Sequence, residues 1–124
     1  MSKKILVVED NGKNRMLIKD ILLYHGYEVI EAENGKIGVE LAKQHLPDLI
    51  LMDIQMPVMD GFTAIVLLKN DPDTKSIRMI ALTSFAMKGD KEKIMRAGFD
   101  DYIAKPIDTR KLPEIVKKYA GNGL

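Results

Sequence analysis

Acidic, hydroxyl and amine side chains stand directly after short apolar runs of this sequence. Glu9 and Asp10 follow the first run, and Asp53 follows another. Thr83 and Lys105 come at the ends of two later runs. If the runs are parallel strands of one sheet, their carboxyl ends meet at one edge, where open α/β sheets form their sites. The sequence therefore predicts that three carboxylates, a hydroxyl and an ammonium group lie together.

Three carboxylates in one place favour a bound cation. Their mutual repulsion is substantial at a partly buried site, and it raises their pKa values unless a positive charge joins them. Mg²⁺ prefers oxygen ligands and takes carboxylates together with water and phosphate oxygens. Mg²⁺ and the Lys105 ammonium group would balance the three negative charges. A carboxylate in such a site can be the nucleophile of a phosphoryl transfer.

Each residue also has an ordinary structural explanation. Glu9 and Asp10 could cap the helix that follows them, since acidic side chains often accept hydrogen bonds from the first helical amides. Asp53 could simply begin a loop. Thr83 could satisfy backbone groups, and Lys105 could be a surface charge. Their shared position at strand ends favours the phosphoryl-transfer interpretation over these alternatives.

The apolar runs have the pattern of buried parallel strands. Residues 5–8, 49–52 and 79–82 are wholly apolar, which is typical of strands with helices on both faces. Residues 27–32 and 102–104 are weaker strand candidates. Four of the methionines are expected in the core as flexible fillers, namely Met16, Met52, Met79 and Met95.

Five segments with helical spacing lie between or after these strands. Their apolar stripes are Met16, Leu17, Ile21 and Leu22; Ile37, Leu41 and Ala42; Phe62, Ile65, Val66 and Leu68; Met87, Ile94, Met95 and Ala97; and Leu112, Ile115, Val116 and Tyr119. Gly26 and Gly98 are expected to end the first and fourth helices. The Asn34-Gly35 pair precedes a helix here, although it can also form a hairpin. This alternation predicts a doubly wound α/β fold, with a five-stranded parallel sheet and five helices.

Length and composition exclude several classes of protein. A chain of 124 residues with 46% hydrophobic residues suits one domain, which we expect to span residues 1–120 before a flexible tail at 121–124. The formal net charge of +1 does not favour a nucleic-acid partner. The absence of cysteine excludes disulfides, zinc–thiolate sites and thiol nucleophiles. No apolar run has the length of a membrane span or a signal peptide, so we expect a cytoplasmic protein.

At these residues the sequence resembles the receiver domain of two-component response regulators. The matching motifs are VVEDN at 7–11, DLILMDIQMPVMDG at 48–61, IALTS at 80–84 and AGFDDYIAKP at 97–106. The resemblance covers essentially the whole chain. It implies a flavodoxin-like fold with strand order 2-1-3-4-5.

The resemblance implies a metal site and an acceptor. Asp53 matches the phosphoacceptor. Asp10 is expected to bind Mg²⁺ directly and Glu9 largely through water. Gln55 should contribute its backbone carbonyl to the metal. Lys105 should bind the acceptor carboxylate or the phosphoryl oxygens.

The resemblance also implies a switch. The peptide bond between Lys105 and Pro106 is expected to be cis. Thr83 matches the hydroxyl that binds a phosphoryl oxygen, and Tyr102 matches the aromatic ring that turns inward when Thr83 moves. A half-buried strand tyrosine is the ordinary alternative for Tyr102.

The implied function is a phosphoacceptor response regulator rather than an enzyme. A sensor histidine kinase or a histidine phosphotransfer protein would phosphorylate Asp53. The surface of the fourth helix, fifth strand and fifth helix would then bind a downstream protein target, with the protein a monomer or a weak phosphorylation-dependent dimer. Gln55 and Phe85 match positions that tune the lifetime of the phosphoryl group, and the absence of an acidic or amide side chain at Phe85 predicts slow autodephosphorylation. Ordinary solvation is the favoured explanation for the basic residues of that surface, Lys88, Lys91, Lys93, Arg96, Lys111, Lys117 and Lys118.

Three alternatives compete with a stand-alone regulator. A phosphatase of the haloacid dehalogenase type also uses an aspartate nucleophile and Mg²⁺, but it needs a second aspartate where this sequence has Gln55. A receiver that binds partners without phosphorylation would have lost one of the site residues, and none is lost. The chain could also be a receiver excised from a larger hybrid kinase, although the short tail after residue 120 favours a stand-alone protein.

Overall fold

Strands and helices alternate along the chain in the computed structural model, which describes residues 2–84 and 87–123. In order they are β1 Lys4–Val8, α1 Gly12–Tyr24, β2 Glu28–Ala32, α2 Gly35–His45, β3 Leu49–Asp53, α3 Gly61–Lys69, β4 Arg78–Thr83, α4 Lys88–Ala97, β5 Asp101–Ala104 and α5 Lys111–Ala120. The five strands form one parallel sheet in the order β2-β1-β3-β4-β5. The predicted fold class and strand order are confirmed.

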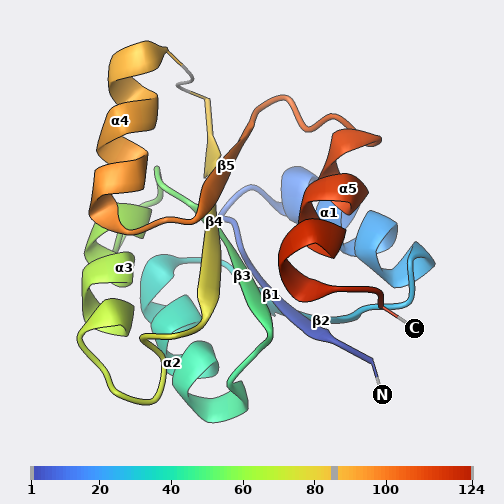
Figure 1. The fold of residues 1–124 in the computed structure, drawn as a ribbon, viewed down its shortest axis with the longest axis horizontal. Coiled ribbons are helices and arrows are strands. Elements are labelled where there is room, and N and C mark those ends of the chain that lie inside the picture. Colours follow the sequence, from blue (N-terminus) through green and yellow to red (C-terminus); the bar gives the residue numbers. More distant parts are fainter. Residues whose placement is uncertain (1, 85–86, 124) are drawn as a thin grey trace.

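The sheet is the middle of three layers. Helices α2, α3 and α4 cover one face, and α1 and α5 cover the other (Figure 1). Alternate side chains of β3 point to opposite faces of the sheet. Ile50 and Met52 pack against α2, α3 and α4, and Leu49 and Leu51 pack against α1 and α5. All four are fully buried. This burial on both faces explains why the strand is apolar throughout.

Asparagine and aspartate side chains begin three of the helices. Asn11 Oδ1 accepts hydrogen bonds from two amides of the first turn of α1, both at 3.0 Å. Asn34 caps α2, and Asp60 caps α3, in the same manner. The Asn34-Gly35 pair therefore starts a helix and not a hairpin. The capping explanation for Glu9 and Asp10 is wrong, because Asn11 is the cap of α1.

Several apolar residues do not face the core as the sequence predicted. In α1 the buried residues are Ile18 and Leu22, whereas Met16 is 63% exposed. Val66 and Met95 are also exposed. Helices that lie on a sheet bury a narrow stripe, and neighbouring apolar residues leave the position of that stripe open. Leu17 and Met87, which the sequence analysis also placed in apolar stripes, are exposed as well.

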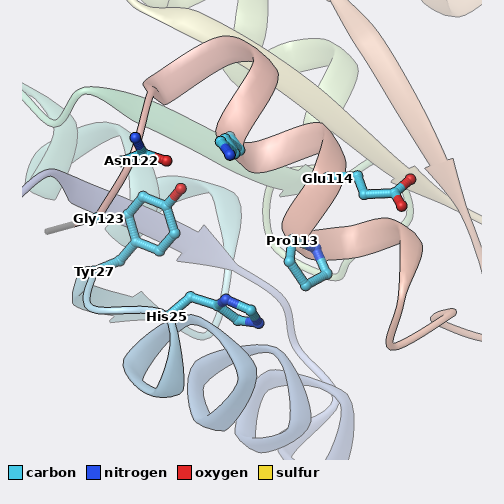
Figure 2. Close-up of a pocket in the computed structure, with 7 residues that line it drawn as sticks. His25, Tyr27, Pro113, Glu114, Asn122 and Gly123 are labelled. Atoms are coloured by element: carbon cyan, nitrogen blue, oxygen red, sulfur yellow. The ribbon is translucent and has the colours of Figure 1, made fainter.

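The C-terminal segment is packed where a flexible tail was expected. The Tyr27 hydroxyl donates a hydrogen bond to the Gly121 carbonyl at 2.6 Å. Gly123 is buried, and a Cβ atom there would lie 2.5 Å from the His25 carbonyl oxygen. Figure 2 shows Asn122 and Gly123 beside a cavity of about 400 Å³ that also contacts α5. Glycine allows this close approach because it has no side chain.

None of the helices within residues 2–84 and 87–123 combines the length and the apolar composition that a membrane span requires.

We expect Gly35→Ala to destabilise the protein, since a Cβ atom there would overlap the Met59 carbonyl oxygen. The loop after β3 would have to shift, and we expect a loss of about 1–3 kcal/mol in the free energy of unfolding, measured by urea denaturation. Gly89→Ala is a matched control near the start of α4, where no atom of the described residues, apart from the adjacent residues and the helix backbone, lies within 4 Å of the added carbon. It should be neutral or stabilising by up to about 1 kcal/mol. Equal effects of the two substitutions would contradict the packing argument.

Candidate functional site

The pairing of the central strands brings two acidic residues side by side. Val8 lies opposite Met52 in the register of β1 with β3. Glu9 and Asp53 follow these two residues, so they are neighbours at the carboxyl edge of the sheet. On its other side Asp53 lies opposite Leu82 of β4. The structure therefore brings Glu9 and Asp53 together at the carboxyl edge of the sheet, as the sequence predicted.

Strands β4 and β5 bring a hydroxyl and an ammonium group to the same edge. Thr83 ends β4 and lies opposite Ala104 of β5. The Lys105 amide donates a hydrogen bond to the Thr83 carbonyl at 2.8 Å. The peptide bond between Lys105 and Pro106 is cis, as expected. The chain leaves β5 at this point with the Lys105 side chain directed to the acidic residues.

A single ammonium group joins the two buried carboxylates. Lys105 Nζ donates to Asp53 Oδ2 at 2.7 Å and to Glu9 Oε1 at 2.8 Å. Its side chain is 15% exposed, and those of Glu9 and Asp53 are 0% and 4% exposed. Hydrogen bonds to ionised groups are stronger than neutral ones, especially away from water. Lys105 thus holds both carboxylates in place.

A backbone amide fixes the other oxygen of Asp53. The Gln55 N–H donates to Asp53 Oδ1 at 2.9 Å. With Lys105 on Oδ2, both oxygens of the carboxylate have a donor. The Gln55 residue is itself exposed, so its side chain is not part of the buried cluster. The role of its carbonyl as a metal ligand stays a prediction.

The surroundings of Glu9 disfavour the ionised form of its carboxyl group. Burial, followed by the hydrogen bond and charge of Asp53, raises the pKa of Glu9 to about 7. Lys105 acts in the opposite direction but does not cancel these effects. Glu9 Oε2 is buried and has no hydrogen-bond partner among the described residues. A buried acceptor without a donor is costly, and a cation would satisfy it.

The acidic residues fit a divalent metal ion. One oxygen each of Glu9, Asp10 and Asp53 lie within 4.8 Å of one another. Asp10 is exposed, which gives a hydrated ion access from solvent. Within this cluster Lys105 contributes one positive charge against three carboxylates. All the donors are oxygen atoms, which is the ligand type of Mg²⁺.

The two expected switch residues lie on neighbouring strands. Thr83 is fully buried at the end of β4. Tyr102 of β5 is half-buried, and its ring centroid lies 5.3 Å from Lys91 Nζ. Phe85, on which the predicted slow autodephosphorylation depends, lies outside the described residues. The movement of Thr83 and Tyr102 stays a prediction.

The basic residues assigned to one surface face in different directions. Lys93 Nζ lies 4.7 Å from the centroid of the Phe62 ring, so it faces α3. Lys117 of α5 lines the cavity beside His25, at the end of α1. The assignment of Lys93 and Lys117 to the surface of α4, β5 and α5 is therefore wrong. Helical spacing alone does not tell which side of a helix a neighbouring element covers.

Two residues that support Glu9 were missed by the sequence analysis. Asn14 Nδ2 donates to Glu9 Oε1 at 3.1 Å. Arg15 donates to the Glu9 carbonyl at 2.7 Å and pairs with Glu31 at 3.4 Å. The available signal was their position in the first turn of the helix after the acidic pair, capped by Asn11, where side chains can reach back to the strand end.

The geometry agrees with the similarity of this chain to known proteins. The family model described as response regulator receiver domain matches residues 5–117. The polar-differentiation response regulator DivK of Brucella anthropi is 44% identical over 122 residues, which are 98% of this chain and 99% of the relative. The DivK protein of Brucella ovis is 43% identical with the same coverage.

Solved structures show the same similarity. The receiver domain of a sensor histidine kinase from Pseudomonas aeruginosa, described with a magnesium ion coordinated in the active site cleft, has a TM-score of 0.90 and 35% identity. The match covers 98% of this chain and 100% of that one. A putative response regulator from Chloroflexus aurantiacus has a TM-score of 0.92 and 28% identity, with the same coverage.

We expect the raised pKa of Glu9 to make the metal-free protein less stable as the pH rises. Protonated Glu9 stabilises the fold below its ordinary pKa of 4.5, and this contribution is lost as the pH rises through about 7. Glu9→Gln keeps the shape but stays neutral. In EDTA, its melting temperature relative to the wild type should therefore be higher at about pH 8 than at about pH 5. A constant difference between the two proteins would contradict the assignment.

Proposed function

This chain belongs to the response regulator receiver domain family, and we propose that it is a phosphoacceptor that is phosphorylated on Asp53. The donor would be a sensor histidine kinase or a histidine phosphotransfer protein. The observation that carries the proposal is the position of the Asp53 carboxylate, which is buried at a strand end, bound by Lys105 and next to two further acids. These residues bring positive charge and a fixed nucleophile together.

The transfer requires little chemistry from the protein. A carboxylate oxygen of Asp53 forms a bond to phosphorus, and the bond from phosphorus to the donor histidine nitrogen breaks. The leaving imidazole keeps the bonding electron pair and takes a proton from solvent. Lys105, at 2.7 Å from Asp53 Oδ2, would neutralise charge on the phosphoryl oxygens. The Gln55 amide keeps the carboxylate in orientation.

The acidic cluster would hold Mg²⁺ during transfer. Glu9, Asp10, Asp53 and the Gln55 backbone carbonyl are the proposed ligands, with Glu9 acting largely through water. When bound, the ion supplies positive charge to the phosphoryl oxygens. The support for this proposal is the three-carboxylate cluster and the buried Glu9 oxygen without a hydrogen-bond donor. Lys105 and Asn14 orient Glu9 through its other oxygen.

Phosphorylation would act as a switch of the surface formed by α4, β5 and α5. The new phosphoryl oxygens offer hydrogen-bond acceptors to Thr83. Movement of Thr83 would make room for Tyr102, which is half-buried in the present state. The change is a shift between two existing conformations, read by a downstream protein target. We propose a monomer or a weak phosphorylation-dependent dimer.

We propose a single-domain cytoplasmic regulator rather than an enzyme. Its support is the 99% coverage of the Brucella relatives, which are named response regulators. The alternative is that the chain is a receiver from a hybrid kinase. Its support is weaker, because the receiver domain of the Pseudomonas aeruginosa sensor histidine kinase is 35% identical, against 44% for the Brucella anthropi relative. The haloacid dehalogenase alternative lacks support, because Gln55 replaces the second aspartate and the matching family is another one.

We expect Asp53→Asn to abolish Mg²⁺-dependent phosphorylation by acetyl phosphate, because an amide is not a nucleophile for this reaction. Intact mass spectrometry would show the added phosphoryl group on the wild type only. Asp73→Asn, on an exposed acid outside the cluster, is the matched control and should be modified like the wild type. Full modification of Asp53→Asn would overturn the site assignment.

We expect Lys105→Ala to fold but to respond poorly. Removal of the ammonium group that contacts both carboxylates should slow phosphorylation by acetyl phosphate by about tenfold or more. It should also reduce the phosphorylation-dependent NMR shifts of the Thr83 and Tyr102 amides. Lys13→Ala, at an exposed residue of α1, is the control. A rate and shifts equal to those of the wild type would disprove the role of Lys105.

A further inference from the structure

Helix α3 is apolar on its outer side as well as on its inner side. Ala64, Ile65 and Leu68 are fully buried in the core. Val66 and Leu67, on the same helix, are 54% and 43% exposed. A helix that covers one face of a sheet normally has a polar outer side, whereas one that is apolar all round is typical of a buried helix. The outer side of α3 is thus suited to being covered.

An open groove of about 890 Å³ lies between α3 and α4, and we call it the α3–α4 groove. Figure 1 shows these two helices on the same side of the sheet. The apolar residues that line the groove are Phe62, Val66, Leu67 and Ala97. Gly89 adds no side chain, and beyond its own helix backbone and adjacent residues no atom of residues 2–84 and 87–123 lies within 4 Å of the position of a Cβ atom there. Exposed apolar patches with polar rims are typical of interaction sites.

The polar rim of the groove is mainly basic. Lys93 and Arg96 come from α4, one helical turn apart. The Arg96 side chain is 78% exposed, and its ion pair with Glu92 is loose, at 3.9 Å. The acidic residue of the lining is Asp60, whose carboxylate is engaged as the cap of α3 by the Thr63 amide at 2.8 Å. The lining thus has two positive charges against the one negative charge of Asp60, which the capping hydrogen bond orients but does not remove.

We propose that the α3–α4 groove binds an acidic amphipathic helix of a partner protein. Apolar side chains of that helix would pack on Val66, Leu67 and the Phe62 ring. Its carboxylates would pair with Lys93 and Arg96 at the rim. Helices bind grooves of this kind through apolar anchors spaced three and four residues apart. The anchors supply most of the affinity, and the rim charges supply selectivity and orientation.

The groove is connected to the phosphoacceptor loop. A second cavity, of about 270 Å³, is lined by Ile54, Gln55, Phe62, Asp90 and Lys93. Phe62 and Lys93 line both spaces. The Gln55 amide in turn donates to Asp53. Binding in the groove and phosphorylation of Asp53 therefore affect each other's free energy reciprocally, and this part of the proposal rests on the proposed function.

The test uses a fluorescent peptide of about 18 residues, long enough to form a helix. It carries leucines at helical spacing, glutamates beside them and alanines elsewhere, and a second peptide has lysines in place of the glutamates. Fluorescence anisotropy with the unphosphorylated protein should give binding at least about tenfold tighter for the acidic peptide. Equal affinities, or no binding of the acidic peptide, would overturn the proposal.

Val66→Glu tests the place of binding and is matched by Leu23→Glu on α1. The two residues are 54% and 49% exposed, so both substitutions should leave the fold intact, as checked by circular dichroism. Val66→Glu should weaken binding of the acidic peptide by about tenfold, and Leu23→Glu by less than about twofold. An equal loss in both variants would overturn the proposal. Sedimentation would also show whether the protein forms a dimer. A dimer that Val66→Glu disrupts would overturn the proposal, because the groove would then bind a second copy of this chain.

A final measurement separates this proposal from the proposed function. Acetyl phosphate and Mg²⁺ are added, phosphorylation is followed by intact mass, and peptide affinity is measured again. A change in affinity of threefold or more on phosphorylation, or about 0.7 kcal/mol, supports the coupling. Unchanged affinity of fully phosphorylated protein would refute the coupling. Failure of the protein to accept a phosphoryl group would refute the proposed function, while the peptide result without phosphodonor still decides the groove.

Discussion

A single ammonium group lies between two buried carboxylates at the carboxyl edge of the sheet, and much of the local structure serves this contact. Glu9 and Asp53 reach it because β1 and β3 pair in a fixed register. Lys105 reaches it from β5, two strands away from β3. The contact is only partly satisfied, since burial raises the pKa of Glu9 and one of its oxygens has no donor among the described residues. The cluster therefore favours a further positive charge, which is the property that a metal-assisted phosphoacceptor needs.

Such a cluster weakens the fold, and the strands around it offset the cost. Burying carboxylates beside one another is unfavourable unless they are paired and hydrogen-bonded. The strands that hold them are fully buried, including Leu51 of β3 and Ile80 of β4, which belong to the same core cluster. Close packing transmits small displacements. A change of charge at Asp53 can thus displace neighbouring strands and helices.

The two layers of helices present different surfaces. On the side of α3 and α4, apolar side chains and the basic residues Lys93 and Arg96 share one groove. On the other side, the segment 121–123 fills part of the space between α5 and the start of β2, where Tyr27 binds Gly121. Lys93 and Lys117, which the sequence analysis assigned to one surface, therefore line two different surfaces. The groove, through Phe62, is the surface that also borders the loop after Asp53.

The amino-acid pattern alone predicts the fold class, the helix ends at Gly26 and Gly98, and the meeting of the site residues at one sheet edge. These follow from local patterns, because buried parallel strands are apolar throughout and polar residues at their ends share an edge. The folded structure is needed to see that Ile18 and not Met16 faces the core, and that Asn14 supports Glu9. It also decided which neighbours Lys93 contacts. The physical reason is that a helix's rotation and its neighbours depend on packing between segments distant in sequence, which no local pattern contains.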